Sequence, residues 1–286
     1  MTIVAGFPGK GTGDPETAYV ILAADSEESG MVLKSSVRKI ARIERAQWKC
    51  LVAGAGGGDF IDLAVQQIEL LAAPPSSLSE ARECIEGIVT EIHRKRIQKL
   101  PAEDRAAQSF ELLCALWVEG EGVQLCRVGL GFSLILHAPV TIGSGEHLAR
   151  YLIATYHYPL LPLYHMTRLA VYLLSEAKKH VMYCGGSSQV VWIDARGQLE
   201  ELFPGTIAEH ERSNAAVMEV AGRGILYLAD PLGWGNDLSK VDAAVDSVAQ
   251  TVKDSIKRHY PHLASQTQTA RPLPPTPTLP SDGKDE

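Results

Sequence analysis

The order of its apolar runs constrains the fold of this chain more than any other feature of the sequence. Short runs typical of strands form three groups, and a pair of amphipathic helical segments separates each group from the next. The predicted strands are 3–7, 18–24, 38–43, 48–54, 110–118, 123–128, 134–142, 190–193 and 199–202. Grouped strands with helix pairs between them fit two stacked sheets covered by helices, which is an α+β fold.

The helical segments carry their own start signals. Asp59 begins the first one after a glycine run, and Ser77 with Glu80 forms a capping box for the second. The second pair begins near Glu146 and Thr167. Apolar residues recur along one side of these segments at helical spacing, so we expect them to cover a sheet.

The second residue of the chain is a candidate nucleophile. Thr2 follows Met1, and removal of Met1 would leave a threonine with a free α-amine. A threonine hydroxyl is a weak nucleophile at neutral pH and needs an adjacent base. A free α-amine, with a pKa of about 8, supplies that base within the same residue. Met-Thr is also an ordinary protein start, so the hypothesis depends on the residues that follow.

Two charged residues downstream are suited to tune such a nucleophile. The apolar run 19–24 ends in Asp25, which predicts a buried strand with a carboxylate at its end. A lysine beside the threonine, for which Lys34 is the candidate, would favour the neutral amine and the loss of the hydroxyl proton. Asp25 would keep that lysine charged. The alternative is a turn aspartate and a surface lysine.

A glycine ends the next strand candidate. The apolar run 50–53 leads into Gly54. A glycine at this place can turn its backbone N–H toward a developing oxyanion. It can equally make room between two packed elements, and the sequence does not separate these two interpretations.

Several short motifs occur in a fixed order along the chain. They are Thr2-Ile3-Val4, Leu22–Ser26, Lys34 followed five residues later by Lys39-Ile40, Val52–Gly56, Ile142–Gly145 and Tyr183–Gly186. In this order they resemble the pattern of proteasome β-subunits and HslV, which are N-terminal-nucleophile (Ntn) hydrolases. The resemblance covers residues 2–195.

The resemblance implies a four-layer αββα sandwich and a threonine-type endopeptidase that acts in a homo-oligomeric ring. Its substrates would be peptides or unfolded polypeptides, delivered with or without an ATPase unfoldase. The implied site residues are Thr2 as nucleophile, Asp25 and Lys34 as the pair that tunes it, Gly54 as the oxyanion donor, and Ser144 as a support for the amine.

Two alternative functions use the same fold. A strict match of Ile3-Val4 to family members that begin Thr-Thr-Ile-Val puts Met1 at the nucleophile position, and a shift of one residue turns the opposite side chain toward the site. Val181 and Cys184 stand where the family has an aspartate and a serine. The shift makes a catalytically inactive structural subunit one alternative, and the missing aspartate does not decide it, because HslV-type members also manage without it. An Ntn amidase on small molecules is the other alternative.

Composition divides the chain into three parts. We expect residues 1–202 to form the Ntn hydrolase-like domain and residues 203–263 to form a C-terminal extension that packs on it. Within this extension, 226–231 predicts a strand and a turn, and a helix begins at Ser239. Prolines among threonine, serine and glutamine make 264–286 a disordered tail.

Charge and cysteine usage exclude several classes. The formal net charge of −7 argues against a nucleic-acid binder, and the chain lacks both a run of about 18 apolar residues and a secretory leader. The five cysteines contain no CxxC pair, and the glycines around Lys10 lack phosphate-loop spacing. We therefore expect a cytoplasmic protein with no metal, cofactor or membrane partner.

Overall fold

The computed structural model describes residues 3–9, 18–29, 34–158, 161–229, 246 and 250. The chain divides into two compact units, Met1–Asn214 and Ala215–Glu286. The first unit contains two five-stranded sheets.

One sheet has five antiparallel strands in the order β5-β6-β7-β8-β9. The strands are β5 (Ile40–Glu44), β6 (Trp48–Gly56), β7 (Phe110–Val118), β8 (Gly122–Gly129) and β9 (Phe132–Leu136). In the central strand β7 every residue except Glu111 is buried. A strand that is apolar on both faces needs a covering layer on each side, and its sequence therefore shows a continuous apolar run.

The second sheet also has five antiparallel strands, in the order β10-β1-β2-β11-β12. They are β10 (Val140–Gly143), β1 (Ile3–Gly9), β2 (Tyr19–Asp25), β11 (Ser188–Asp194) and β12 (Leu199–Glu201). A short two-stranded sheet, β3 (Glu27–Ser29) with β4 (Lys34–Ser36), follows β2 directly. The strand β2 therefore delivers Asp25 from the middle of the second sheet.

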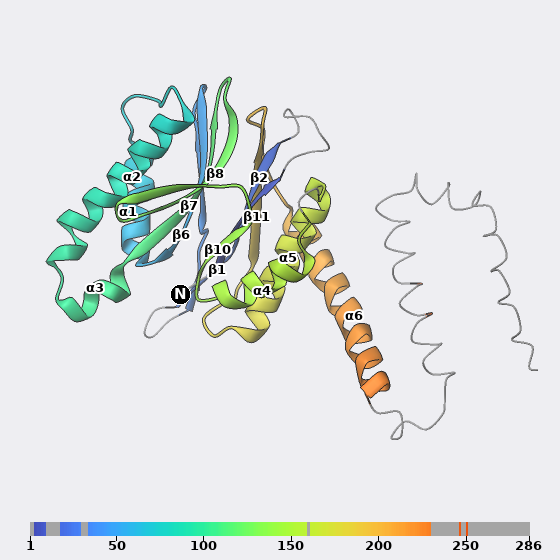
Figure 1. Ribbon diagram of the computed structural model, residues 1–286. Helices are drawn as coiled ribbons and strands as arrows, with labels where there is room; N and C mark the ends of the chain where they lie inside the picture. The colour runs from blue at the N-terminus through green and yellow to red at the C-terminus, as the bar shows by residue number, and fades with distance from the viewer. Residues whose placement is uncertain are drawn as a thin grey trace, which may run out of the picture. The chain divides into compact units, whose positions relative to one another are not determined.

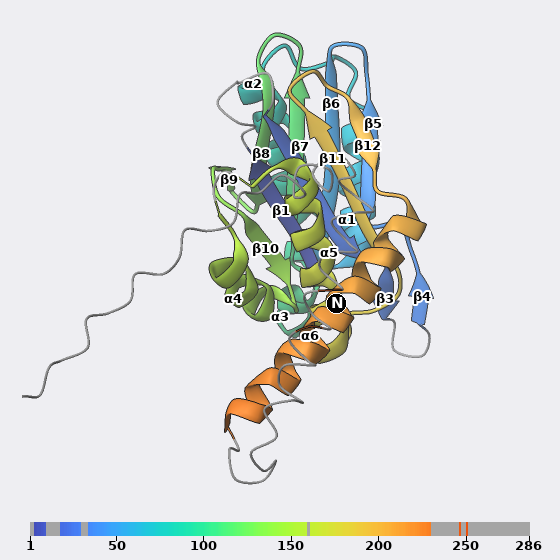
Figure 2. The same ribbon diagram turned by 90° about the vertical axis from the view of Figure 1, so that its right-hand side faces the viewer.

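Helices cover the outer face of each sheet. The helices α1 (Gly58–Glu69) and α2 (Leu78–Lys95) pack on the β5–β9 sheet, and α4 (Glu146–Tyr156) and α5 (Leu163–His180) pack on the other (Figure 1). The remaining helical elements are η2 (Ile97–Lys99), α3 (Ala102–Gln108) and α6 (Pro204–Ala229). Figure 2 shows the second sheet from the side of α5. The αββα sandwich predicted from the sequence is confirmed.

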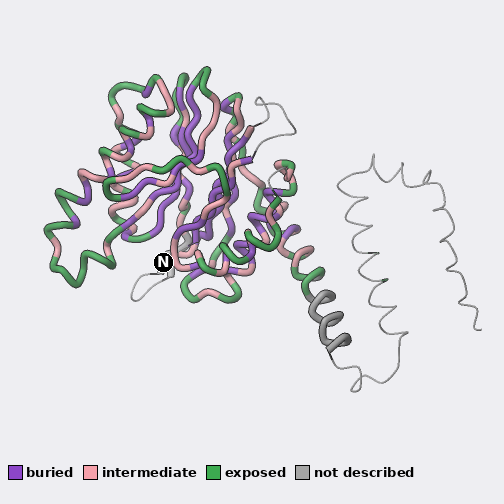
Figure 3. The backbone as a smooth tube through the Cα atoms, in the orientation of Figure 1, coloured by how far each residue is buried: buried purple, intermediate pink, exposed green. Residues whose placement is uncertain are grey.

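Three apolar clusters lie between the four layers. One joins α1 and α2 to their sheet through residues such as Ile68 and Ile85. Another joins α4 and α5 to the second sheet through Leu173 and its neighbours. The third lies between the two sheets and includes Leu22 and Leu51. Figure 3 shows that the buried backbone concentrates in the strands of both sheets.

Two of the predicted strands are wrong. The expected strand 134–142 is divided into β9 and β10, which belong to different sheets. Pro139 lies between them and has no N–H for a ladder hydrogen bond, so the chain leaves one sheet there before it enters the other. The expected strand 226–231 is helical as far as Ala229, at the end of α6. A short apolar run cannot be assigned to strand or helix by periodicity alone.

Other predictions fall outside the described residues. These are most of the helix expected after Ser239, the proline-rich tail 264–286 and Thr2. The division between the two units at Asn214 lies inside α6. The predicted boundary between 202 and 203, just before α6, stays a prediction.

Candidate functional site

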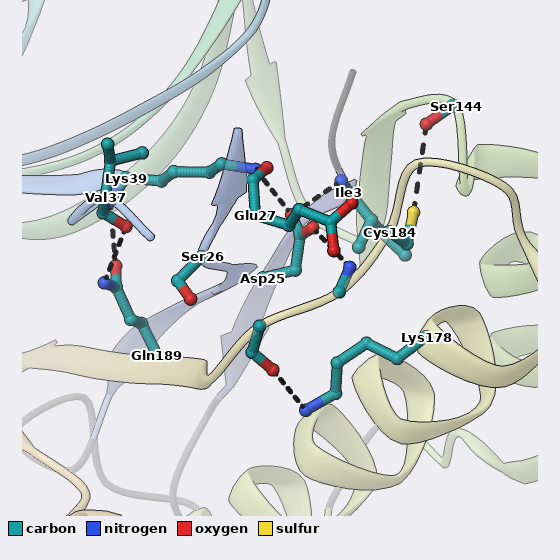
Figure 4. Close-up of polar contacts among 12 residues, drawn as sticks. Ile3, Asp25, Ser26, Glu27, Val37, Lys39, Ser144, Lys178, Cys184 and Gln189 are labelled. Atoms are coloured by element: carbon teal, nitrogen blue, oxygen red, sulfur yellow. Dashed lines mark hydrogen bonds and ion pairs between the residues drawn. The ribbon is translucent and has the colours of Figure 1, made fainter. Parts of the chain in front are cut away.

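A buried carboxylate at the end of β2 organises the candidate site. Asp25 has no exposed surface. Its Oδ1 accepts hydrogen bonds from the backbone N–H of Ile3 at 3.1 Å and from Lys39 Nζ at 2.9 Å. Its Oδ2 accepts from the N–H of Gly185 at 3.0 Å. Burial of a carboxylate costs free energy unless it is paired, and here a cation and two amides pair it (Figure 4).

The lysine that reaches Asp25 is Lys39. Its ammonium group forms the ion pair with Asp25 and also donates to the backbone carbonyl of Glu27. The Lys39 side chain is 11% exposed, so water screens the pair only weakly. The β5–β6 register begins with Ile40 opposite Ala53, and Lys39 is the residue just before it. Lys39 therefore lies next to the end of the ladder whose β6 partner, Ala53, precedes Gly54.

The sequence analysis selected a different lysine. Lys34 begins β4, where its backbone pairs with Ser29. The structure brings Lys39 to Asp25, and the role of Lys34 stays a prediction. The position of Lys39, immediately before the predicted strand residue Ile40, is the sequence feature that could have suggested it.

Gly54 lies in β6, opposite Leu112 of β7. A Cβ atom at this position would lie 2.8 Å from Ile61 Cγ2 in α1. The missing side chain therefore lets α1 approach the sheet, as the packing interpretation of this glycine expects. A backbone N–H is present whatever the residue, so this close packing leaves the oxyanion role of Gly54 as a prediction.

Ser144 and Cys184 lie beside each other near Asp25. The Ser144 Oγ is 3.8 Å from the Cys184 Sγ. Burial raises the pKa of the Cys184 thiol; the hydrogen bond with Ser144 lowers it, the charge of Asp25 raises it, and the charge of Lys39 lowers it. The balance leaves a neutral thiol within electrostatic range of the Asp25–Lys39 pair.

The loop that carries Cys184 has an unusual backbone. Tyr183 has a φ of 69°, in the left-handed region that residues other than glycine rarely adopt. Gly186 has a φ of +70°, and a Cβ atom there would lie 2.4 Å from Ser26 Oγ. Such conformations persist only where the surroundings fix them. This loop therefore needs several anchors.

The anchors are hydrogen bonds to the end of β2, to the start of β3 and to α5. The N–H of Gly185 donates to Asp25, and its carbonyl accepts from the N–H of Glu27 at 3.1 Å. The N–H of Ser187 donates to Ser26 Oγ at 2.8 Å. From α5, Lys178 Nζ donates to the Gly186 carbonyl at 3.2 Å. These contacts tie the loop to the end of β2 and so to Asp25.

Thr2 itself lies outside the described residues. It is joined by a peptide bond to Ile3, and the nitrogen of that bond donates to Asp25. Ile3, the residue that follows Thr2 in the sequence, is therefore the described residue that links this end of the chain to the Asp25–Lys39 pair.

The described residues contain neither a metal-binding cluster nor a membrane-spanning helix. No group of three or more His, Cys, Asp or Glu side chains there is placed to hold a metal ion. None of the helices there combines the length and apolar character needed to cross a bilayer.

Solved structures with this fold include Anbu proteins. Anbu (ancestral beta-subunit) from Yersinia bercovieri matches at 14% identity with a TM-score of 0.63, over 81% of this chain and 98% of that one. A Gly-1 mutant of Anbu from Hyphomicrobium sp. strain MC1 matches at 12% identity and a TM-score of 0.64, over 78% and 97%. The helical assembly of the Anbu complex from Pseudomonas aeruginosa matches at 12% and 0.62, over 78% and 96%.

These likenesses establish the fold, and they correct the family named from the motifs. No protein-family model matches the sequence, and no curated protein matches it. The similar structures are Anbu proteins, which are proteasome-like but distinct from proteasome β-subunits and HslV. The assignment to those two families is therefore wrong. Motifs of three to five residues describe a site on a shared fold and cannot separate families that share it.

We predict that Asp25→Asn destabilises the fold by about 3–5 kcal/mol, because it removes the carboxylate that is ion-paired with the nearly buried Lys39 ammonium group. Urea unfolding followed by circular dichroism measures the change. Asp194→Asn is the matched control: Asp194 Oδ1 accepts two backbone N–H groups in an exposed turn, and an amide oxygen can replace it there. Equal losses in the two variants would contradict the importance assigned to the Asp25 pair.

Proposed function

We propose that this chain is an Ntn hydrolase that cleaves peptide bonds with Thr2 as its nucleophile, after removal of Met1. The observation that carries the proposal is the geometry at Asp25. One carboxylate receives the N–H of Ile3, the residue next to Thr2, and the ammonium group of Lys39. A nearly buried cation close to the backbone that follows Thr2 supports this proposal, because a weak nucleophile is activated by groups that lower its pKa.

The chemistry divides into two transfers. The Thr2 hydroxyl gives its proton to the α-amine of the same residue, and its oxygen attacks the substrate carbonyl. The protonated amine then gives that proton to the leaving nitrogen as the amide bond breaks, which leaves an ester on Thr2. In the second half, the amine takes a proton from water as the water oxygen attacks the ester. The amine returns the proton to the Thr2 oxygen as the ester bond breaks, which restores the hydroxyl and the neutral amine.

Lys39 and Asp25 make these transfers easier through charge. A cation near the hydroxyl favours its deprotonated form, and a cation near the amine favours the neutral amine that acts as base. Asp25 holds the cation in place and balances its charge inside the protein. The role first assigned to Lys34 therefore passes to Lys39 in this proposal.

The oxyanion and the amine need partners of their own. The backbone N–H of Gly54 is our candidate donor to the tetrahedral oxyanion, because Gly54 follows Ala53, which pairs with Ile40, the residue next to Lys39. Ser144 is our candidate support for the amine, since it follows β10, whose Gly143 pairs with Ile3.

We further propose that the chain acts as a homo-oligomer on peptides or unfolded polypeptides in the cytoplasm, with or without an ATPase unfoldase. Support for assembly comes from the similar structure described as a helical assembly of the Anbu complex. Enclosure of the sites in an assembly would keep folded proteins away from them.

An inactive structural subunit is the second candidate function. The specific observation in its favour is Cys184, which stands beside Ser144 as a buried neutral thiol. A thiol is a weaker hydrogen-bond donor than a hydroxyl. Ser144 would then be held less firmly than a site for proton transfer needs.

Hydrolysis of fluorogenic peptides by matched variants tests the peptidase. We expect Thr2→Ala to reduce activity to background and Lys39→Met to lower kcat by about 10²-fold or more, since positioned acid–base groups contribute on that scale. Lys49→Met is the control: Lys49 also has a hydrogen-bond partner, the Gly197 carbonyl at 2.6 Å, but it lies near the start of β6, at the far end of the β5–β6 ladder from Ile40. Retained activity in Thr2→Ala, or equal effects of the two lysine variants, would refute the proposal.

Light scattering on the purified full-length chain tests assembly. We expect a native mass of two or more times the 30.9 kDa of one chain. Hydrolysis of small amides by a 30.9 kDa monomer would instead identify an open-site amidase.

A further inference from the structure

We propose that Gln189 is a positioning residue that holds the backbone of Lys39, so that its ammonium group stays against Asp25. This inference rests on the proposed function for the importance of Lys39, but its geometry stands independently. Gln189 was not among the residues predicted from the sequence. It takes part in none of the hydrogen bonds to Asp25 described above.

The side-chain amide of Gln189 makes three hydrogen bonds to one short segment. Its Oε1 accepts from the N–H of Lys39 at 2.9 Å and from the N–H of Ile40 at 3.2 Å. Its Nε2 donates to the carbonyl of Val37 at 3.3 Å. Both ends of one amide are therefore used, and all three partners lie within four consecutive residues. Figure 4 shows Gln189 beside Val37 and Lys39.

Asp25 and Gln189 come from neighbouring strands of the second sheet. In the β2–β11 ladder Asp25 pairs with Ser188, and Gln189 pairs with Ala24. The carboxylate and the amide therefore lie at the same end of the sheet, on opposite faces of it, because successive residues of a strand alternate between faces. One takes the ammonium group of Lys39 and the other takes its backbone N–H, so both ends of this residue are held.

The segment that carries Lys39 needs such a hold. Residues 37–39 belong to no strand, and β5 begins only at Ile40. The register of β5 with β6 also begins at Ile40, so the N–H of Lys39 lies beyond the end of that ladder. A lysine side chain has four flexible bonds, and its head group is placed reliably only when its backbone is fixed.

Glutamine fits this role better than the residues closest to it in size. Methionine has a similar length but can make none of the three hydrogen bonds. Glutamate keeps an acceptor for the two N–H groups, but it cannot donate to the Val37 carbonyl when it is ionised. Gln189→Met therefore removes the hold, and Gln189→Glu removes one part of it.

Pulse acylation of lysines with acetic anhydride on the folded protein tests the hold directly. Mass spectrometry of the digested protein then gives the labelling rate of each lysine. We expect Lys39 to react slowly in the wild type, because it is 11% exposed and ion-paired. Gln189→Met should raise the labelling rate of Lys39 about tenfold or more. In this variant, local opening of the segment no longer has to break the three hydrogen bonds of the Gln189 amide. Gln189→Glu should give an intermediate rate.

Two internal controls keep this result interpretable. Gln198→Met makes the same change at an exposed position in the β11–β12 turn and should leave Lys39 labelling unchanged. Lys49, which donates to the Gly197 carbonyl, should keep its wild-type rate in every variant. An unchanged Lys39 rate in Gln189→Met overturns the proposal. So does a rise at Lys49 equal to that at Lys39 in both Gln189 variants, because it would show a general structural role.

Peptide hydrolysis then separates this inference from the proposed function. If the wild type is a peptidase, Gln189→Met should lower kcat with KM nearly unchanged and shift the pH profile of kcat, and Gln189→Glu should recover part of the loss. If the wild type does not hydrolyse peptides, the proposed function fails, and the labelling of Lys39 still decides whether Gln189 positions it.

Discussion

The rest of the candidate site depends on the hydrogen bonds that Asp25 accepts. Its two oxygens join the start of the chain at Ile3, the segment before β5 at Lys39 and the loop after α5 at Gly185. A buried carboxylate is tolerated only when its charge and lone pairs are satisfied. The same requirement that stabilises Asp25 therefore brings together segments that are distant in the sequence.

The αββα architecture makes this convergence possible. The strand β2 lies in the middle of its sheet, with β1 on one side and β11 on the other. Its end at Asp25 is thus flanked by Ile3 and by the start of β11 at Ser188. The second sheet packs against the first through a common apolar cluster, and the start of β5 at Ile40 pairs with Ala53, next to Gly54 in β6. The site is assembled from strand ends rather than from one motif.

The sequence could predict the layers and part of the site. Continuous apolar runs such as 110–118 mark strands that are covered on both faces, and the run ending in Asp25 correctly predicts a buried carboxylate. Local pattern could not decide between Lys34 and Lys39, because the choice depends on which lysine precedes the strand paired with β6. Gln189 was missed because its role rests on a β2–β11 ladder that joins residues far apart in the chain.

The central claim is that Thr2 becomes a free N-terminal nucleophile beside the Asp25–Lys39 pair. The most direct test is the mass of the intact protein and of its N-terminal peptide after incubation with a β-lactone that acylates active N-terminal threonines. The account predicts a chain without Met1 that carries one probe molecule on the peptide beginning at Thr2. Retention of Met1, or acylation at Cys184 in place of Thr2, would contradict it.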